Sequence, residues 1–234
     1  MLEIIPAILE KSLADIEGQL ARIRGAVREV QLDIADGILV QNKTWPFAEA
    51  AQHTEFDRIA AQEEGLPLWE DFDFEVDLMI QNPEAHALAW VSAGASRIIL
   101  HAESEGILAA ARALSGVRGE DNLFPAKVGL ALQSSAEVGS LELFEGLYDF
   151  VQVMGIERVG FQGQAFDERA VALVAQLRAR HSDLTIQVDG GVTLRNARAL
   201  AQAGTNRLIA GSAIFGSSDP KKEIEELRRE ANRT

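Results

Sequence analysis

The sequence predicts a single-domain (β/α)8 barrel, and three observations support this fold class. Short apolar, β-branched segments alternate with longer segments of helical period along the chain. This order is typical of a parallel sheet covered by helices. Eight such units can be counted, which is the number of parallel strands that closes into a barrel. The length of 234 residues also fits, since one barrel domain commonly spans roughly 200 to 250 residues. We therefore expect residues 1–234 to form one domain.

The strands are predicted where Val, Ile and Leu are concentrated in short runs. The eight segments are Glu3–Ile8, Arg28–Ile34, Phe72–Met79, Ser96–Leu100, Ala126–Leu132, Tyr148–Met154, Leu184–Asp189 and Asn206–Ala210. Amphipathic stretches such as residues 12–26, 82–95 and 167–183 lie between them and predict helices, several of which open at a Ser, Asn or Asp cap. The Ala-Gly pairs at Gly94 and Gly204 indicate helix ends.

The connection between the second and third predicted strands is elongated at residues 53–73. This stretch, HTEFDRIAAQEEGLPLWEDFD, is rich in acidic and aromatic residues, and it predicts an extended helix followed by a loop. Loop statistics favour a solvated surface insertion. A lid over the site or a contact between subunits is the alternative.

Composition excludes several classes of protein. Hydrophobic residues make up 47% and charged residues 25% of the chain, which is the balance of a soluble globular protein. No apolar run approaches the roughly 20 residues that a membrane span needs. The start has an acidic Glu3 and no basic segment before an apolar stretch, so no secretory signal is predicted and a cytoplasmic location is expected.

Charge and cysteine content restrict the partners and the chemistry. The net charge of −14 repels nucleic acid and anionic lipid, so neither is expected as a partner. The chain contains no cysteine, which excludes disulfides, thiolate metal sites and a cysteine nucleophile. Any phosphate must then be held largely by local backbone dipoles, and any chemistry must use oxygen or imidazole groups.

Three predicted strands end in carboxylates. The period of two along VQLDIADG places Gln31 and Asp33 on one face of the second strand. The same count places Asp77 and Asp189 on the inner face of the third and seventh strands. Active sites of such barrels lie at the carboxyl ends of the strands. We therefore expect the three aspartates to converge at one mouth, where like charges raise each other's pKa values or recruit a cation. A solvated ring of acids at the rim is the alternative.

Three glycine-rich loops follow neighbouring strands at the end of the chain. They are GFQGQ after the sixth strand, DGG after the seventh and AGSA after the eighth. Glycine lets backbone N–H groups approach an anion closely, and the last loops of this fold recurrently bind phosphate. The residues predicted to bind phosphate are Gly160, Gly163, Gly190, Gly191, Gly211 and Ser212.

The four histidines divide into two groups. His53, His86 and His181 fall on predicted helices, where a surface or capping role is expected. His101 closes the strand SRIILH. Its position allows either a side chain at the mouth of the barrel or a packing role.

The chain resembles the ribulose-phosphate 3-epimerase family over nearly its whole length. The motifs IIPAIL, LDIADGILVQNKT, VDLMIQNPE, ILHAES, GFQGQAF, VDGGV and AGSAIF follow the order and spacing of that family. The resemblance implies a metal-dependent enzyme acting on a phosphorylated ketopentose, with self-association into a homo-oligomer. It also implies that one strand-end aspartate removes the C3 proton and a second one reprotonates the opposite face. Asp33 and Asp189 match these two positions.

The expected metal site departs from the family pattern. Two histidines of the family site correspond here to Gln31 and Asp77. Asp33, Asp77, Asp189 and Gln31 form the candidate ligand set, and oxygen donors in place of imidazoles favour Mg²⁺ or Mn²⁺ over zinc or iron. Loss of the metal site is the alternative. Other departures from the family pattern are Ala7, Ala35 and the segment 157–159.

Three functional hypotheses follow. The first is an epimerase that interconverts D-ribulose 5-phosphate and D-xylulose 5-phosphate through a metal-stabilised enediolate. The second is an isomerase or aldolase acting on another sugar phosphate, which the altered ligand set motivates. The third is a noncatalytic phosphosugar-binding protein that has lost its metal site.

Overall fold

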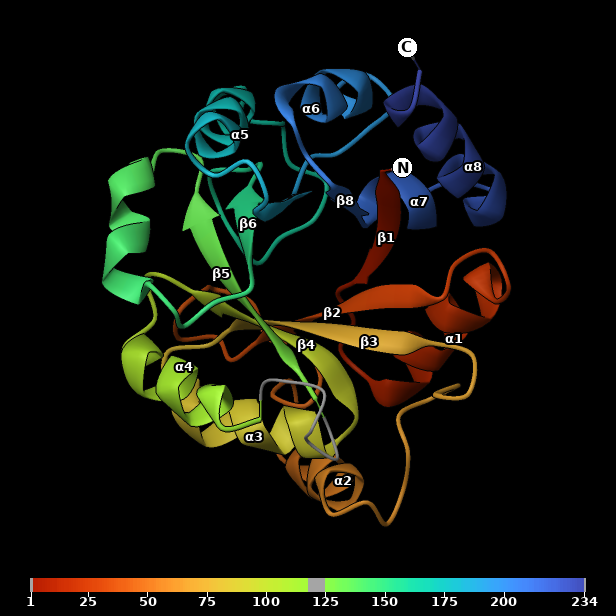
Figure 1. Cartoon of the computed structure of the whole chain (residues 1–234). Helices are drawn as coiled ribbons and strands as arrows, with labels where there is room; N and C mark the ends of the chain where they lie inside the picture. The colour runs from red at the N-terminus through yellow and green to blue at the C-terminus, as the bar shows by residue number, and fades with distance from the viewer. Residues whose placement is uncertain (1, 118–124, 234) are drawn as a thin grey trace.

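The computed structural model describes residues 2–117 and 125–233, and its centre is a closed barrel of eight parallel strands. The strands follow one another around the barrel in chain order, with β8 pairing with β1 (Figure 1). Their bounds are β1 (Glu3–Ile8), β2 (Glu29–Ala35), β3 (Asp73–Met79), β4 (Ala95–His101), β5 (Lys127–Gln133), β6 (Phe150–Met154), β7 (Thr185–Asp189) and β8 (Arg207–Ala210). The predicted (β/α)8 barrel is confirmed.

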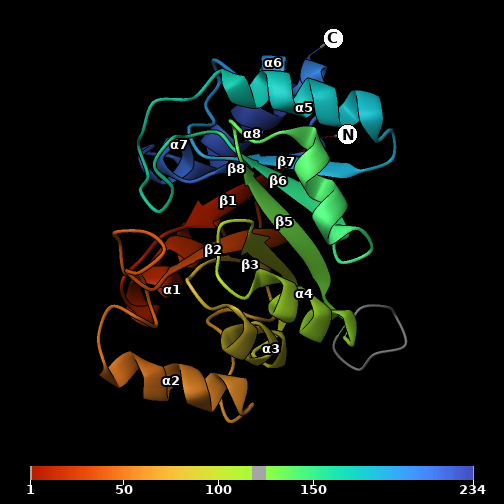
Figure 2. The same ribbon diagram turned by 90° about the vertical axis from the view of Figure 1, so that its left-hand side faces the viewer.

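Helices surround the barrel, and each strand is followed by at least one of them (Figures 1 and 2). They are α1 (Leu13–Ile23), α2 (Ala51–Ala60), α3 (Glu84–Ser92), α4 (Ile107–Ser115), the 3-10 helix η1 (Val138–Phe144), α5 (Arg169–Arg180), α6 (Ala197–Ala203), α7 (Ser212–Phe215) and α8 (Pro220–Ala231). Ser12 caps α1 by accepting from the N–H of Asp15, and Asp219 caps α8 by accepting from that of Lys222. None of the described helices has the length and apolar character needed to cross a membrane.

Two apolar layers hold the barrel together. The larger lies between the sheet and the helices and includes the aromatic side chains of Trp45, Phe56 and Trp90. The rings of Phe56 and Trp90 have centroids 4.4 Å apart, and Trp45 meets Trp90 edge-on at 5.8 Å. The smaller layer lies inside the barrel and includes Ile99 and Phe150. The wall of the barrel is therefore fixed from both sides.

The connection between β2 and β3 consists of a loop at residues 36–50, α2 and a compact turn at residues 61–72. Leu66 in this turn is 2% exposed and belongs to the core, whereas Trp69 is 61% exposed. The ion pair between Arg28 and Asp73, with an N–O distance of 3.0 Å, holds the end of the turn at the amino ends of β2 and β3. The turn therefore lies at the end of these strands opposite to the carboxyl ends, where it cannot cover them.

Gly129 on β5 makes room for an aromatic ring inside the barrel. A Cβ atom at this position would lie 2.5 Å from ring atoms of Phe150 and 3.0 Å from Ile99 Cγ1. These distances are too short for van der Waals contact, so a side chain at Gly129 would displace the ring that fills the interior.

We expect Gly129→Ala to lower the free energy of unfolding by about 1–3 kcal/mol, because the added methyl group overpacks the interior. Gly18→Ala is the matched control, since Gly18 lies in α1 with no atom within 4 Å of the added Cβ. The control should raise stability by about 0.5–1 kcal/mol. Urea unfolding followed by circular dichroism measures both, and equal effects of the two substitutions would contradict the overpacking argument.

Candidate active site

Three aspartates meet at the carboxyl ends of the strands, as predicted. Asp33 lies on the inner face of β2 near its carboxyl end, Asp77 lies opposite it on β3, and Asp189 closes β7. One carboxylate oxygen from each lies within 4.8 Å of the others. Asp77 is wholly buried, and Asp33 and Asp189 are only 7% and 8% exposed. The three therefore form a buried cluster rather than a solvated ring at the rim.

The side chain of Gln31 lies beneath two of these carboxylates. Its amide nitrogen donates to Asp33 Oδ1 at 2.7 Å and to Asp189 Oδ2 at 3.0 Å. Its amide oxygen is buried and accepts no hydrogen bond from any described residue. Gln31 thus supplies partial positive charge between two acids and leaves one acceptor unused.

Asp77 is held from two other strands. His101 Nε2 on β4 lies 2.8 Å from Asp77 Oδ1, and Gln152 Nε2 on β6 donates to Asp77 Oδ2 at 3.1 Å. From the sequence, His101 could either face the mouth of the barrel or pack in its interior. In the structure His101 is buried and lies against Asp77. Sequence reasoning missed Gln152, although FVQVM alternates in the same way as the strand of Gln31.

The electrostatics of the cluster favour protonation of two carboxyl groups. Burial raises the pKa of Asp33 well above its ordinary value, and the charges of Asp189 and Asp77 raise it further. Burial and the charge of Asp77 raise the pKa of Asp189 to about 7, against the lowering effect of the Gln31 amide. Without a cation, the cluster relieves its repulsion by binding protons near neutral pH.

The same residues fit a hard divalent cation. The three carboxylates each offer an oxygen to one group. The amide oxygen of Gln31 is buried and unpaired among the described residues, but the amide nitrogen is the end that faces two of these carboxylates. Negative carboxylates that lie close together with too few hydrogen-bond donors to compensate them are typical of sites that bind such a cation. His101 is not a member of the candidate ligand group of the described residues, since it lies against Asp77 as a hydrogen-bond partner.

The predicted phosphate-binding residues line the same cavity as Asp33 and Asp189. Gly160, Gly163, Gly190, Gly191, Gly211 and Ser212 all belong to its wall. Four of these glycines, Gly160, Gly163, Gly190 and Gly191, have φ between +67° and +99°, where L side chains are strained. The N–H groups of Gly163, Gly190 and Gly191 donate no hydrogen bond to another described residue. They remain free to bind an anion.

The loop after β6 packs against the loop after β2. Asn42 Nδ2 donates to the carbonyl oxygen of Gly160 at 2.8 Å, and a Cβ at Gly160 would lie 2.6 Å from Val40 Cγ2. Figure 2 shows the teal loop after β6 reaching past the barrel on the side of the orange-red loop after β2. This contact borders the cavity, so glycine at position 160 lets the two loops meet there.

Comparison with known proteins shows the family of the chain. The model of the "Ribulose-phosphate 3 epimerase family" matches residues 3–215. The chain belongs to this family. It is a family of sugar-phosphate epimerases, and the match covers every strand of the barrel and the three glycine-rich loops.

Curated relatives of this epimerase family match over most of their length. The ribulose-phosphate 3-epimerase of Bacillus subtilis (strain 168) is 31% identical over 236 residues, which cover 97% of this chain and 99% of that protein. The chloroplastic ribulose-5-phosphate-3-epimerase of Arabidopsis thaliana is 30% identical over 229 residues, which cover 95% of this chain and 75% of that protein.

Solved structures of other barrel enzymes share the fold. The 3-hexulose-6-phosphate synthase from Salmonella typhimurium superposes with a TM-score of 0.69 at 16% identity, with 98% of each chain covered. KGPDC from Streptococcus mutans has a TM-score of 0.67 at 12% identity, covering 100% of this chain and 98% of that one. At such low identity the likeness shows the architecture alone.

We expect the metal-free protein to lose stability as the pH rises from about 4 to above 7. The folded pKa of Asp189, about 7, lies above its ordinary value of 3.8. The folded state therefore binds the proton more tightly than the unfolded state. Its contribution, on the order of 4 kcal/mol, is fully present below pH 3.8 and disappears through pH 7.

Urea unfolding in a chelator across this pH range measures the effect, with Asp189→Asn as the comparison. The variant should show a shallower fall in stability, because the amide does not titrate. Identical pH profiles for the two proteins would rule out a raised pKa at Asp189.

Proposed function

We propose that the protein interconverts D-ribulose 5-phosphate and D-xylulose 5-phosphate by inversion at C3. The observation that carries the proposal is that Asp33 and Asp189 face one cavity that the glycine-rich loops also line. Acid/base groups and a candidate phosphate cradle thus lie within reach of one small molecule. The membership of the family supports the choice of a ketopentose phosphate as substrate.

Inversion at C3 requires two carboxyl groups, one ionised to accept a proton and one protonated to donate a proton. The C3 proton is acidified by the neighbouring carbonyl, and one carboxylate removes it to leave an enediolate. The other carboxyl group, approaching from a different strand, then delivers a proton to the opposite face of C3. Without a cation, the pKa of Asp189 is about 7 and that of Asp33 is raised. A bound cation would lower both pKa values, so the proposed proton transfers rest on the positions of the two carboxyl groups on different strands.

Asp33, Asp77 and Asp189 would hold a divalent cation, with the amide oxygen of Gln31 as a further ligand. When bound, the cation supplies positive charge that stabilises the negative oxygens of an enediolate. Because every candidate ligand is an oxygen, we propose Mg²⁺ or Mn²⁺ rather than zinc or iron.

We assign the phosphate group to the glycine-rich wall of the same cavity. The N–H groups of Gly163, Gly190 and Gly191 supply donors, and the hydroxyl of Ser212 lies in the same wall. Several backbone donors can bind an anion in a protein whose overall charge repels it. The phosphate would then fix the sugar so that C3 lies near the aspartates.

One observation favours a second candidate, a phosphosugar-binding protein without turnover. The Gln31 amide nitrogen already bridges Asp33 and Asp189, and it would have to rotate for its oxygen to face a cation. Ribulose 5-phosphate binding with no exchange at C3 under Mg²⁺ or Mn²⁺ would establish this candidate.

Deuterium exchange at C3 in heavy water tests the epimerase proposal. We expect Asp33→Asn and Asp189→Asn each to slow epimerisation by about 10²–10⁴-fold, because each removes one acid/base group. Each variant should still place deuterium at C3 of one sugar without inversion, and the two variants should act on opposite epimers. NMR of the C3 position measures both the exchange and the inversion.

Asp77→Asn is the matched control, since Asp77 is proposed as a ligand and not as a base. It should slow exchange in both epimers alike and weaken the dependence on Mn²⁺. Turnover that survives both chelation and Asp33→Asn would overturn the proposed mechanism.

The phosphate assignment predicts a separate effect on binding. A Cβ at Gly211 would clash with Gln162 Nε2 and lie 3.0 Å from the carbonyl oxygen of Ala7, so Gly211→Ala crowds the cradle. We expect KM to rise about tenfold, which corresponds to about 1.4 kcal/mol, with a smaller change in kcat. Gly139→Ala is the control, because nothing lies within 4 Å of its added Cβ. An unchanged KM for Gly211→Ala would contradict the assignment of the phosphate to this part of the cavity.

A further inference from the structure

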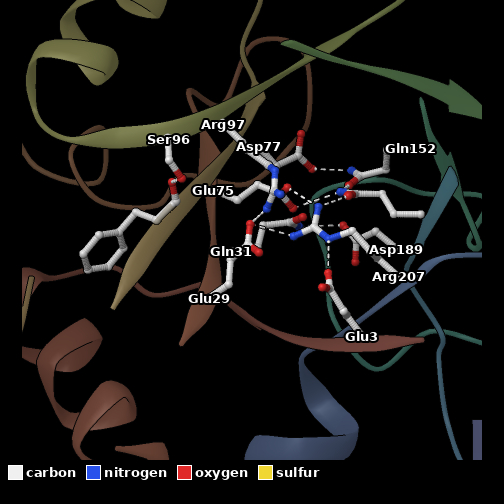
Figure 3. Close-up of polar contacts among 12 residues, drawn as sticks. Glu3, Glu29, Gln31, Glu75, Asp77, Ser96, Arg97, Gln152, Asp189 and Arg207 are labelled. Atoms are coloured by element: carbon white, nitrogen blue, oxygen red, sulfur yellow. Dashed lines mark hydrogen bonds and ion pairs between the residues drawn. The ribbon is translucent and has the colours of Figure 1, made fainter. Parts of the chain in front are cut away.

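A column of polar side chains runs through the barrel below Asp77. Barrels of this fold usually fill the interior with bulky apolar residues. Here Gln152, Gln187, Glu75 and Arg207 occupy that space, and none is more than 3% exposed. Figure 3 shows Gln152, Glu75 and Arg207 gathered there beside Asp77. They come from β6, β7, β3 and β8, so the column links strands from different sides of the barrel.

The column is a continuous chain of hydrogen bonds. Arg207 Nη1 donates to Glu75 Oε2 at 2.6 Å and also to Gln187 Oε1. Gln187 Nε2 donates to Gln152 Oε1 at 2.6 Å and to Glu75 Oε1 at 2.9 Å. Gln152 Nε2 then donates to Asp77 Oδ2. The chain leads from the amino end of the barrel to the carboxylate cluster.

The residues at the two ends of this hydrogen-bond chain, Arg207 and Asp77, fix the direction in which its hydrogen bonds are donated. A guanidinium group can only donate, and an ionised carboxylate can only accept. Because Arg207 occupies the oxygen of Gln187, the nitrogen of Gln187 must face Gln152. The oxygen of Gln152 is occupied in turn, so its nitrogen faces Asp77. Each amide can therefore satisfy its partners in one orientation only.

Arg207 is itself anchored at the amino end of the barrel. Its Nε lies 3.2 Å from Glu3 Oε2 and its Nη2 lies 2.7 Å from Glu29 Oε1. Arg97 forms a second ion pair with Glu29. These contacts are ion pairs by distance, since Arg207 Nε and Nη2 make no hydrogen bond with a described residue. They hold the charge at this end of the barrel, and the hydrogen bonds of Nη1 set the direction that the amides follow.

Stability alone does not explain the column. Replacing buried ion pairs by well-packed apolar residues often leaves a protein equally stable or more stable. The column reaches only one of the three carboxylates, and the remaining oxygen of that carboxylate is held by His101. Both oxygens of Asp77 are thus fixed by donors that do not belong to the cavity wall.

We propose that Arg207, Gln187 and Gln152 are positioning residues that orient the carboxylate of Asp77 toward a divalent cation. The inference rests on the proposed function in that Asp77 is taken as a ligand, but it does not require turnover. Partners behind a ligand fix its direction, and their loss typically lowers metal affinity about 10–100-fold.

Mn²⁺ binding to the chelator-treated protein, measured by calorimetry, tests the proposal without any substrate. Gln152→Met keeps the length of the side chain and removes the donor to Asp77, so we expect Mn²⁺ affinity to fall about tenfold or more. Gln187→Met, one step further along the chain, should lower the affinity in the same direction by a smaller factor. This second variant keeps the test available if Gln152→Met does not fold.

Gln133→Met is the matched control, since Gln133 ends the neighbouring strand β5 and has no hydrogen bond to Asp77 among the described residues. It should leave Mn²⁺ affinity unchanged. In an Asp77→Asn background, Gln152→Met should add little to the loss, because both changes act through one carboxylate. Urea unfolding of the metal-free variants shows whether a general loss of stability accompanies the change.

Unchanged Mn²⁺ affinity in a folded Gln152→Met or Gln187→Met variant would overturn the proposal, as would equal losses in the Gln133→Met control. A wild-type protein that binds no Mn²⁺ would overturn it as well. Failure of the proposed function looks different, because the wild-type protein would then bind Mn²⁺ in the expected pattern without exchanging deuterium at C3.

Discussion

The mutual repulsion of three buried carboxylates is the constraint on which the rest of the site depends. Asp33, Asp77 and Asp189 lie too close together and too far from water to be charged at once without compensation. Gln31 supplies donors to two of them, and His101 and Gln152 supply donors to the third. The negative charge that these donors do not compensate can be neutralised by protons or by a cation.

The barrel creates this cluster because it brings together side chains from separate strands, none of which forms a site alone. Alternation along each strand turns every second side chain inward, and the register between β2 and β3 sets Asp33 beside Asp77 and Gln31 beside Glu75. The carboxylates therefore form one layer and the polar column a deeper one. Apolar residues such as Ile99 and Phe150 fill the other side of the interior, which keeps the polar groups dry and their hydrogen bonds strong.

The departures from the family pattern change the charge of the site. Where the resemblance implies two imidazoles, this chain has the neutral Gln31 and the acidic Asp77. A carboxylate in place of an imidazole adds negative charge to the cluster, which strengthens its demand for a cation or for protons. His101 and Gln152 meet part of this demand by donating to the new carboxylate. The glycine-rich loops line the same cavity as the aspartates.

The sequence by itself determined the barrel, the inward aspartates and the glycine-rich loops, because each depends on short-range signals. A period of two identifies a strand and its inner face, and predicted strands such as Glu3–Ile8 coincide with the observed ones. Other predicted strand ends differ from the observed ones by a residue or two. For example, β6 begins at Phe150 rather than Tyr148. The side chain of Asp149, just before β6, accepts a hydrogen bond from the N–H of Val128. After β5 the chain forms a 3-10 helix that contains Gly139, a poor helix former.

Only the tertiary structure decided which donor meets which carboxylate. Gln152 and Asp77 are 75 residues apart in the chain, and Arg207 and Glu75 are 132 apart. No local pattern relates such positions, since their contacts depend on how the closed barrel places the tips of long side chains. Side-chain direction also separated His101 from the ligands, because the same inward position allows an imidazole either to bind a cation or to hold the carboxylate that does.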